Sequence, residues 1–266
     1  MRADIAIVTE TWLGDQGAEV LGQELSGGSD LGLLTRNRPP NQNGVCYGGV
    51  AVVWKKGSCC LKKAVFKNKE GFEVLVATGS LRGHTRKLVV LAAYLPPSYT
   101  RVRGSEALTY IEDVIIEIKR KYSDPYLVIG GDFNQWRVSR VMDNFADIRE
   151  VDVGNTRGNR SIDKIFINMS RSVVESGTLL PLETEGQDEA MRRRSDHKLT
   201  YCRLLLEKKK AFRWEVYKYR RFNDSAVARF WEWIVMYDWA EVLDEDTSDG
   251  KANAYQGTVL RALSRQ

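Results

Sequence analysis

The chain has 266 residues, of which 43% are hydrophobic and 28% are charged, and its formal net charge at pH 7 is +5. These values are ordinary for a globular protein, so they predict a hydrophobic core, and the length suits one large domain or one domain with an appendage. No apolar run approaches the roughly 20 residues that a membrane helix needs, and no signal-peptide pattern opens the sequence. We therefore expect a soluble intracellular protein.

Few cysteines and histidines limit the metal chemistry that the chain can support. Cys46, Cys59, Cys60 and Cys202 have the spacing of neither a zinc knuckle nor a disulfide framework, so we expect reduced thiols. Two histidines are too few for a histidine-rich transition-metal site. Any metal is then expected to be a hard cation with oxygen ligands, such as Mg²⁺ or Mn²⁺.

The beginning of the chain reads as strands joined by loops rich in glycine, asparagine and proline. Residues 4–8 predict a buried strand with Glu10 at its C-terminal end. A later apolar run ends in the same way at Tyr94, directly before the sequence Leu-Pro-Pro. The strands predicted up to this point lie at residues 4–8, 50–54, 72–78 and 87–94.

A helix is predicted at residues 105–122, where apolar residues recur at helical spacing, Ser105 can cap the start and basic residues suit the C-terminal dipole. Asp124 and Pro125 end this helix, and the next strand leads to Asp132. Further strands are predicted at residues 162–167, 173–180 and 199–206. Many strands and few helices predict two β-sheets packed face to face, with helices on the outer faces.

A different region follows residue 206, where four of the seven tryptophans lie. One helix is predicted to begin at Asn223 or Asp224 and to end near residue 237, and a second to span residues 253–263, with an acidic loop at residues 241–250 between them. The two predicted parts of the chain are a catalytic domain at residues 1–206 and a helical, tryptophan-rich connector at residues 207–266.

Polar clusters at the strand ends suggest metal-assisted hydrolysis of a phosphodiester, which needs charge neutralisation, an aligned water and a stabilised leaving oxygen. Glu10 is placed to hold a divalent cation. Asp132 can orient or deprotonate the attacking water, and Asn134 can donate an amide hydrogen to a phosphate oxygen. His197 can move a proton or donate to the phosphate if a carboxylate fixes its tautomer, and Asp163 is a candidate for that carboxylate.

Other residues extend this hypothesis. Asp196 is a candidate for a second metal or water contact, and the hydroxyl of Tyr94 can reach the phosphate. Each signal has a structural alternative, such as a simple turn, strand-end packing or a solvated edge, so the weight rests on finding them together. A basic run beside His197 suits contacts to a phosphate backbone and consists of Arg192, Arg193 and Arg194.

The order of these motifs resembles the endonuclease/exonuclease/phosphatase superfamily, over roughly residues 3–206. The motifs are Thr9-Glu10-Thr11-Trp12-Leu13, Ala93-Tyr94-Leu95-Pro96, Gly130-Gly131-Asp132-Phe133-Asn134, Ser161-Ile162-Asp163 and Ser195-Asp196-His197. Within the superfamily, the sequences Thr156-Arg157-Gly158 and Gly48-Gly49-Val50-Ala51-Val52 are similar to the endonuclease domain of non-LTR retrotransposons. The region after residue 206 is similar to the connector that leads to a reverse transcriptase in such elements.

The resemblance implies a four-layer α/β sandwich and Mg²⁺-dependent hydrolysis of DNA. It implies that Asp132 positions the nucleophilic water with Asn134 beside it, and that Asp163 is the partner of His197. The other implied roles are metal ligand for Glu10, neighbour of the metal for Asp196, phosphate contact for Tyr94, and hydroxyls near the scissile phosphate for Thr156 and Ser195.

One departure concerns the N-terminus. The family begins with a strand that ends in asparagine and with a helix, before the strand that bears the metal-binding glutamate. Here the sequence starts directly at that second strand, so roughly 25 residues of the fold are expected to be missing.

The leading hypothesis is an endonuclease that nicks DNA, leaves a 3′-hydroxyl, and works in the nucleus with a reverse transcriptase fused downstream. A phosphatase of the same superfamily acting on a small phosphoester is the alternative within the enzyme class. A truncated, non-catalytic remnant that binds nucleic acid is the alternative outside it. The basic run of residues 192–194 suits either kind of substrate and does not decide between them.

Overall fold

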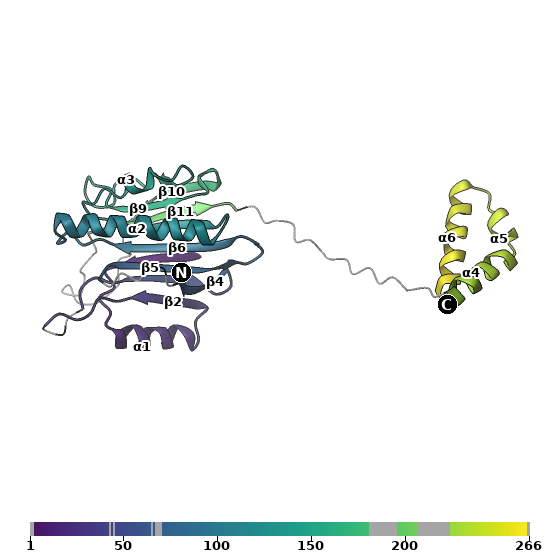
Figure 1. Ribbon diagram of the computed structural model, residues 1–266, viewed down its shortest axis with the longest axis horizontal. Helices are drawn as coiled ribbons and strands as arrows, with labels where there is room; N and C mark the ends of the chain where they lie inside the picture. Colours follow the sequence, from purple (N-terminus) through teal and green to yellow (C-terminus); the bar gives the residue numbers. More distant parts are fainter. Residues whose placement is uncertain are drawn as a thin grey trace. The chain divides into compact units, whose positions relative to one another are not determined.

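A computed structural model describes most of the chain (Figure 1). The chain divides into two compact units, Met1–Ala211 and Phe212–Gln266. The described residues are 3–42, 44, 46–64, 66, 71–180, 196–206 and 224–264.

The first unit is built on a six-stranded mixed β-sheet. Strands β6 and β7 at its centre are parallel, and all other neighbours in the sheet are antiparallel. All residues of β6 except the first are buried, because layers cover both faces of the sheet. The strand order is β4 (Cys59–Ala64), β5 (Glu73–Leu81), β6 (Lys87–Tyr94), β7 (Tyr126–Asp132), β9 (Asp163–Ile167) and β8 (Arg149–Val151).

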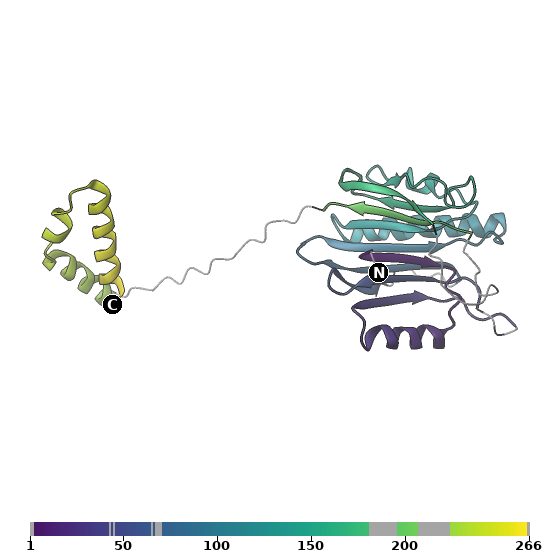
Figure 2. The same ribbon diagram turned by 180° about the vertical axis from the view of Figure 1, so that it is seen from behind.

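Two smaller antiparallel sheets form a second β-layer, visible from behind in Figure 2. A cluster of buried hydrophobic side chains from both layers fills the space between them. At Gly130 the layers approach so closely that a Cβ atom would lie 2.9 Å from Cδ1 of Ile7. The small sheets consist of β1 (Ile5–Thr9), β3 (Val50–Lys55) and β2 (Leu31–Arg36) in that order, and of β10 (Val173–Leu179) with β11 (Leu199–Leu204).

Helix α2 (Arg101–Lys121) covers the opposite face of the six-stranded sheet and buries a second apolar cluster (Figure 1). It begins four residues before the predicted start, because the hydroxyl of Thr100, rather than that of Ser105, accepts the capping hydrogen bond from the backbone N–H of Arg103. The other helices that the structure describes in this unit are α1 (Asp15–Ser26), α3 (Ser139–Met142) and a 3₁₀ turn (Ser170–Ser172).

The predicted architecture is confirmed: the unit is an α/β fold with packed β-layers, one of them a mixed sheet, flanked by helices. Strand β1 lies at an edge of its sheet, and within the described part of the chain only β3 pairs with it. The expectation of a preceding strand and helix stays a prediction.

The second unit is helical, with α4 (Asp224–Met236), α5 (Ala240–Leu243) and α6 (Ser248–Ser264). The prediction of an acidic loop up to residue 250 is wrong at both of its ends. Helix α5 occupies its beginning, and α6 starts early because the hydroxyl of Thr247 accepts the N–H of Gly250 at 3.0 Å.

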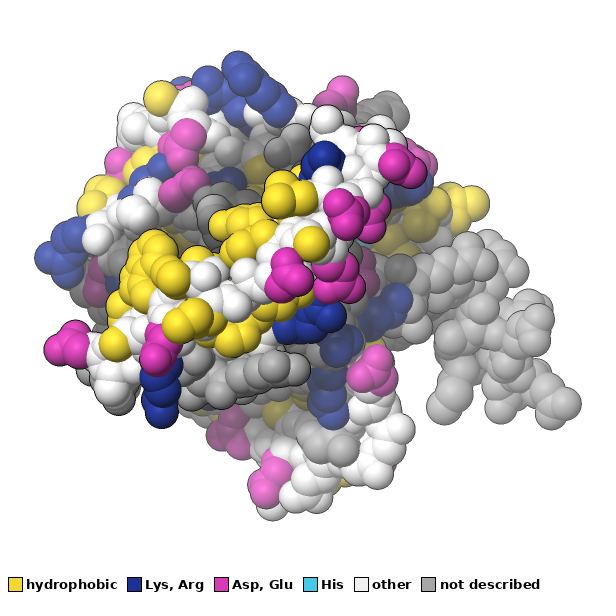
Figure 3. All heavy atoms as spheres, turned by 90° about the vertical axis from the view of Figure 1, so that its right-hand side faces the viewer, with side chains coloured by type: hydrophobic (Ala, Val, Ile, Leu, Met, Phe, Trp, Pro, Cys, Tyr) yellow, Lys and Arg dark blue, Asp and Glu magenta, His cyan; other side chains and the backbone are white. Residues whose placement is uncertain are grey.

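Aromatic packing joins the helices of this second unit. The rings of Trp239 and Tyr255 are stacked, with their centroids 5.5 Å apart. On the face seen in Figure 3, hydrophobic side chains form a band flanked by acidic ones. No helix among the described residues is long and apolar enough to span a membrane.

Candidate active site

Strand register places four polar side chains in one row across the central sheet. The backbone pairs are Glu73 with Tyr94, Tyr94 with Asp132, and Asp132 with Asp163. Because residues paired across neighbouring strands point to the same face of a sheet, these side chains share one face. Parallel strands β6 and β7 end at this row, and antiparallel strands β5 and β9 begin there, so the row lies at one edge of the core.

Asp132 is the buried centre of the row, with 2% of its surface exposed. Its Oδ1 accepts the backbone N–H of Asn134 at 2.8 Å, and its Oδ2 accepts the side-chain amide of Asn134 at 3.0 Å. Burial, together with the nearby charges of Asp163 and Glu10, raises the pKa of Asp132 to about 6, against the lowering effect of the Asn134 hydrogen bond and of His197. The carboxylate is therefore held rigidly and titrates close to neutrality.

The glycine before Asp132 explains why this strand end has a Gly-Gly-Asp sequence. Gly131 has φ of 146°, a conformation that L side chains rarely adopt. A Cβ atom at Gly131 would lie 1.8 Å from the carbonyl oxygen of Ala93 on the neighbouring strand. Only glycine fits between the two strands at this position.

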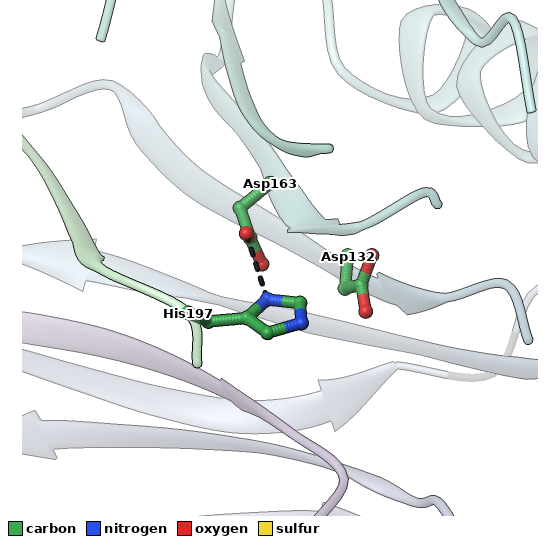
Figure 4. A group of neighbouring side chains, drawn as sticks. All are labelled: Asp132, Asp163 and His197. Atoms are coloured by element: carbon green, nitrogen blue, oxygen red, sulfur yellow. Dashed lines mark hydrogen bonds and ion pairs between the residues drawn. The ribbon is translucent and has the colours of Figure 1, made fainter. Parts of the chain in front are cut away.

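His197 and Asp163 form a hydrogen-bonded pair (Figure 4). Nδ1 of His197 lies 2.9 Å from Oδ2 of Asp163, and both side chains are mostly buried. One nitrogen of His197 and one carboxylate oxygen each of Asp132 and Asp163 all lie within 4.8 Å of one another. The predicted partnership of these residues thus appears in the geometry.

Thr156 lies beneath this pair. Its buried hydroxyl accepts the backbone N–H groups of Ile162 and Asp163, each at 3.1 Å, and its carbonyl accepts the N–H of Lys198 at 2.8 Å. It thereby ties the segment before Asp163 to the segment after His197. These contacts hold the two segments together, and the predicted contact of the Thr156 hydroxyl with the substrate stays a prediction.

Tyr94 and Glu10 form a second hydrogen-bonded pair. The hydroxyl of Tyr94 donates to Oε1 of Glu10. Burial, with the adjacent carboxylate of Glu10, raises the pKa of Tyr94, so the phenol stays protonated and remains a donor. The predicted contact of Tyr94 with a phosphate therefore requires exchange of its present partner.

Sequence reasoning missed Glu73, the last member of the row, which is 4% exposed. Its carboxylate accepts the backbone N–H of Gly49 and forms an ion pair with Arg38. Burial raises the pKa of Glu73 against the lowering effect of these two partners. The sequence offered one hint of this residue, a single carboxylate at the start of an apolar strand. We infer that Glu73 holds the Gly48-Gly49 turn beside Glu10.

The sequence itself decides which family this fold represents. Residues 1–197 match the Endonuclease/Exonuclease/phosphatase family. The chain belongs to this family. No curated protein matches it as a relative.

Solved structures of the endonuclease/exonuclease/phosphatase type share this fold at low sequence identity. Mannosyl-6-phosphatase Bt3783 of Bacteroides thetaiotaomicron VPI-5482 has a TM-score of 0.53 and 12% identity, over 76% of this chain and 85% of that one. D. rerio TDP2 complexed with single-strand DNA product has a TM-score of 0.51 and 14% identity, over 75% and 84%. The Neisseria 3′ phosphatase NExo, bound to a product DNA hairpin, has a TM-score of 0.50 and 15% identity, over 76% and 89%.

Enzymes of the endonuclease/exonuclease/phosphatase family typically use divalent metals, and the donor set here fits such an ion. Asp132 and Asp163 offer carboxylate oxygens next to the imidazole of His197, and the charge of Glu10 acts on Asp132. Hard oxygen donors of this kind suit Mg²⁺ or Mn²⁺. The site can therefore combine a cation with a carboxylate base and a histidine that moves protons.

Of the remaining predicted site residues, the structure describes Asp196 alone. Asp196 is largely exposed and forms an ion pair with Arg157, while its Oδ1 lies 3.9 Å from Nε2 of His197. In this arrangement its carboxylate neutralises Arg157. The predicted substrate contacts Ser195, Arg192, Arg193 and Arg194 lie outside the described residues.

Proposed function

We propose that the chain is a Mg²⁺-dependent phosphodiesterase that nicks DNA and leaves a 3′-hydroxyl, in the manner of the endonuclease domain of non-LTR retrotransposons. The observation that carries the proposal is the convergence of Asp132, Asp163 and His197, whose polar atoms lie within 4.8 Å at one edge of the sheet. The Thr156-Arg157-Gly158 motif supports DNA as the substrate, and so does the likeness of the fold to TDP2 and NExo, whose structures contain product DNA.

Asp132 is the proposed acceptor for the proton of the attacking water. Its pKa of about 6 leaves it ionised at neutral pH yet basic enough to take a proton. Asn134 contributes by holding both carboxylate oxygens of Asp132, and its amide also donates to the carbonyl of Leu95 at 3.1 Å. We therefore assign Asn134 to orienting the base.

His197 is the proposed donor to the phosphate or to the leaving oxygen. The contact between its Nδ1 and Asp163 fixes the ring orientation, and the proposed transfer requires the imidazolium form. In that form Nε2 carries a proton that can be transferred to the departing 3′ oxygen as its bond to phosphorus breaks, which leaves the 3′-hydroxyl.

We assign binding of the divalent cation to the carboxylates around Asp132. A divalent ion bound by Glu10, with Asp132 and Asp163 nearby, would neutralise negative charge on the phosphoryl oxygens. Tyr94 keeps the carboxylate of Glu10 oriented through its hydroxyl. A retrotransposon origin would add a nuclear location and a reverse transcriptase domain as the partner.

The substrate assignment is tested by offering two classes of phosphoester. The purified chain is incubated with supercoiled plasmid and Mg²⁺, and with inositol phosphates under the same conditions. We expect open-circular plasmid whose nicks a DNA polymerase extends directly, since such extension needs a 3′-hydroxyl. Release of phosphate from inositol phosphates without plasmid nicking would instead identify a phosphatase.

A further inference from the structure

Two large aromatic side chains stand exposed on the loops next to Glu10. Trp12 is 54% exposed and Tyr47 is 46% exposed. Their rings are in edge-to-face contact, with centroids 5.4 Å apart and an interplanar angle of 73°. Aromatic rings usually bury their apolar area, so an exposed contacting pair offers a ready surface for a flat ligand.

The backbone holds Trp12 next to the proposed active site. Trp12 follows Glu10 by two residues, so their Cα atoms lie within about 7 Å of each other. Both residues have positive φ, 49° for Trp12 and 53° for Glu10. Non-glycine residues adopt such angles only where the surrounding structure imposes them, and they concentrate at functional sites.

The surrounding structure here is the turn that carries Tyr47. The N–H of Trp12 donates to the carbonyl of Gly48 at 2.8 Å, and Gly49, the next residue, is held by the buried carboxylate of Glu73. One set of contacts therefore fixes both the aromatic pair and Glu10. A ligand ring on this pair would be held at a constant distance from the reacting phosphate.

We propose that Trp12 and Tyr47 form a stacking platform for a nucleobase beside the scissile phosphate. The proposal rests on the proposed function, because it assigns nucleic acid as the substrate class and requires a base that is unpaired or turned out of the duplex. Base–aromatic stacking is tolerant of sequence, so the platform selects polynucleotides over small phosphoesters without reading a sequence.

The test measures binding rather than hydrolysis, in EDTA, by fluorescence anisotropy. The probes are a labelled ten-residue oligo-dT and an oligomer of equal length in which every residue is an abasic tetrahydrofuran. Trp12→Ala is expected to weaken oligo-dT binding by about 5- to 150-fold, from the usual contribution of one stacked base, and to change abasic binding by less than about twofold. Trp12→Phe, which keeps a ring, is expected to retain most of the affinity.

Trp231→Ala is the matched control, because Trp231 is 59% exposed but belongs to the second unit, and it is expected to bind like the wild type. Equal oligo-dT affinity for Trp12→Ala and wild type overturns the platform. Equal weakening of both probes, in a variant with unchanged circular dichroism, also overturns it. Failure of the proposed function would appear separately, as wild type that binds oligo-dT but hydrolyses no phosphodiester with Mg²⁺.

Discussion

Replacing Asp132 by asparagine is expected to stabilise the protein against unfolding while abolishing hydrolysis. The folded state holds the Asp132 carboxylate at 2% exposure, and its pKa rises from 3.8 to about 6. A shift of about two pKa units corresponds to roughly 3 kcal/mol of destabilisation of the ionised form. Asparagine avoids that penalty but loses the hydrogen bond between Asn134 Nδ2 and Oδ2, which is worth about 1 kcal/mol. The expected net gain at pH 7.5 is therefore about 1–2 kcal/mol.

The difference in unfolding free energy between Asp132→Asn and wild type must depend on pH, and its direction follows from the pKa shift. Because the folded pKa of Asp132 lies above the unfolded value, the native state binds this proton more tightly. In the wild type, the stabilisation that comes from binding this proton is fully present below about pH 4 and is lost as the pH rises through about 6. The advantage of Asp132→Asn over wild type should accordingly appear between these pH values and stay constant above them.

The assay is urea unfolding followed by circular dichroism, in EDTA, at pH 4 and pH 7.5. Asp143→Asn, at an exposed position, serves as the control and is expected to change stability by less than about 0.5 kcal/mol at both pH values. The reasoning would be refuted if Asp132→Asn were less stable than wild type at pH 7.5, or if its advantage were the same at both pH values.

Three further predictions concern the same edge of the sheet. Gly131→Ala should destabilise the fold by more than about 4 kcal/mol, since its Cβ would lie 1.8 Å from a backbone oxygen, whereas Gly28→Ala, with no atom within 4 Å, should cost little; thermal unfolding compares them. Asp163→Asn should lower the rate of hydrolysis by about 10²- to 10⁴-fold, because His197 loses the carboxylate that orients its ring for proton transfer. Steady-state kinetics at fixed Mg²⁺ measures this loss, and an unchanged rate would contradict the pairing. The hydrolysis rate should fall about tenfold per pH unit below the Asp132 pKa of about 6, and a flat acidic profile would remove Asp132 as the base.

Strand-end patterns were enough to predict the elements that carry the site. Apolar runs that end in Tyr94 and Asp132 mark buried strands with polar ends, because a buried strand must place its polar residues where it leaves the core. The prediction of a buried strand before Glu10 is wrong in its burial: β1 forms, but it lies at the edge of its sheet and Val8 is 42% exposed. The sequence could not predict the register that aligns Tyr94, Asp132 and Asp163 in one row. Register depends on pairing between segments far apart in the chain, and a single sequence carries no direct measure of it.

The sequence also could not predict which hydrogen-bond partners the polar side chains have. Glu73 stands at the start of a strand of otherwise apolar and small residues, so only the structure reveals that it supports the turn beside Glu10. Thr156 and Asn134 were expected to contact the substrate, which stays a prediction, and only the structure reveals that Thr156 accepts two backbone N–H groups and that Asn134 donates to Asp132. Helix α1 was not predicted because its glycines weaken the helical pattern.

Mg²⁺-dependent nicking of supercoiled plasmid by the wild type, Asp132→Ala and His197→Ala tests the central claim most directly. With folding verified by circular dichroism, we expect the wild type to produce open-circular DNA and each variant to lose at least about 100-fold of that rate. Asp143→Ala, at an exposed position on the helix side of the sheet, should nick like the wild type. A folded wild type without nicking, or active-site variants as fast as the wild type, would contradict the assignment.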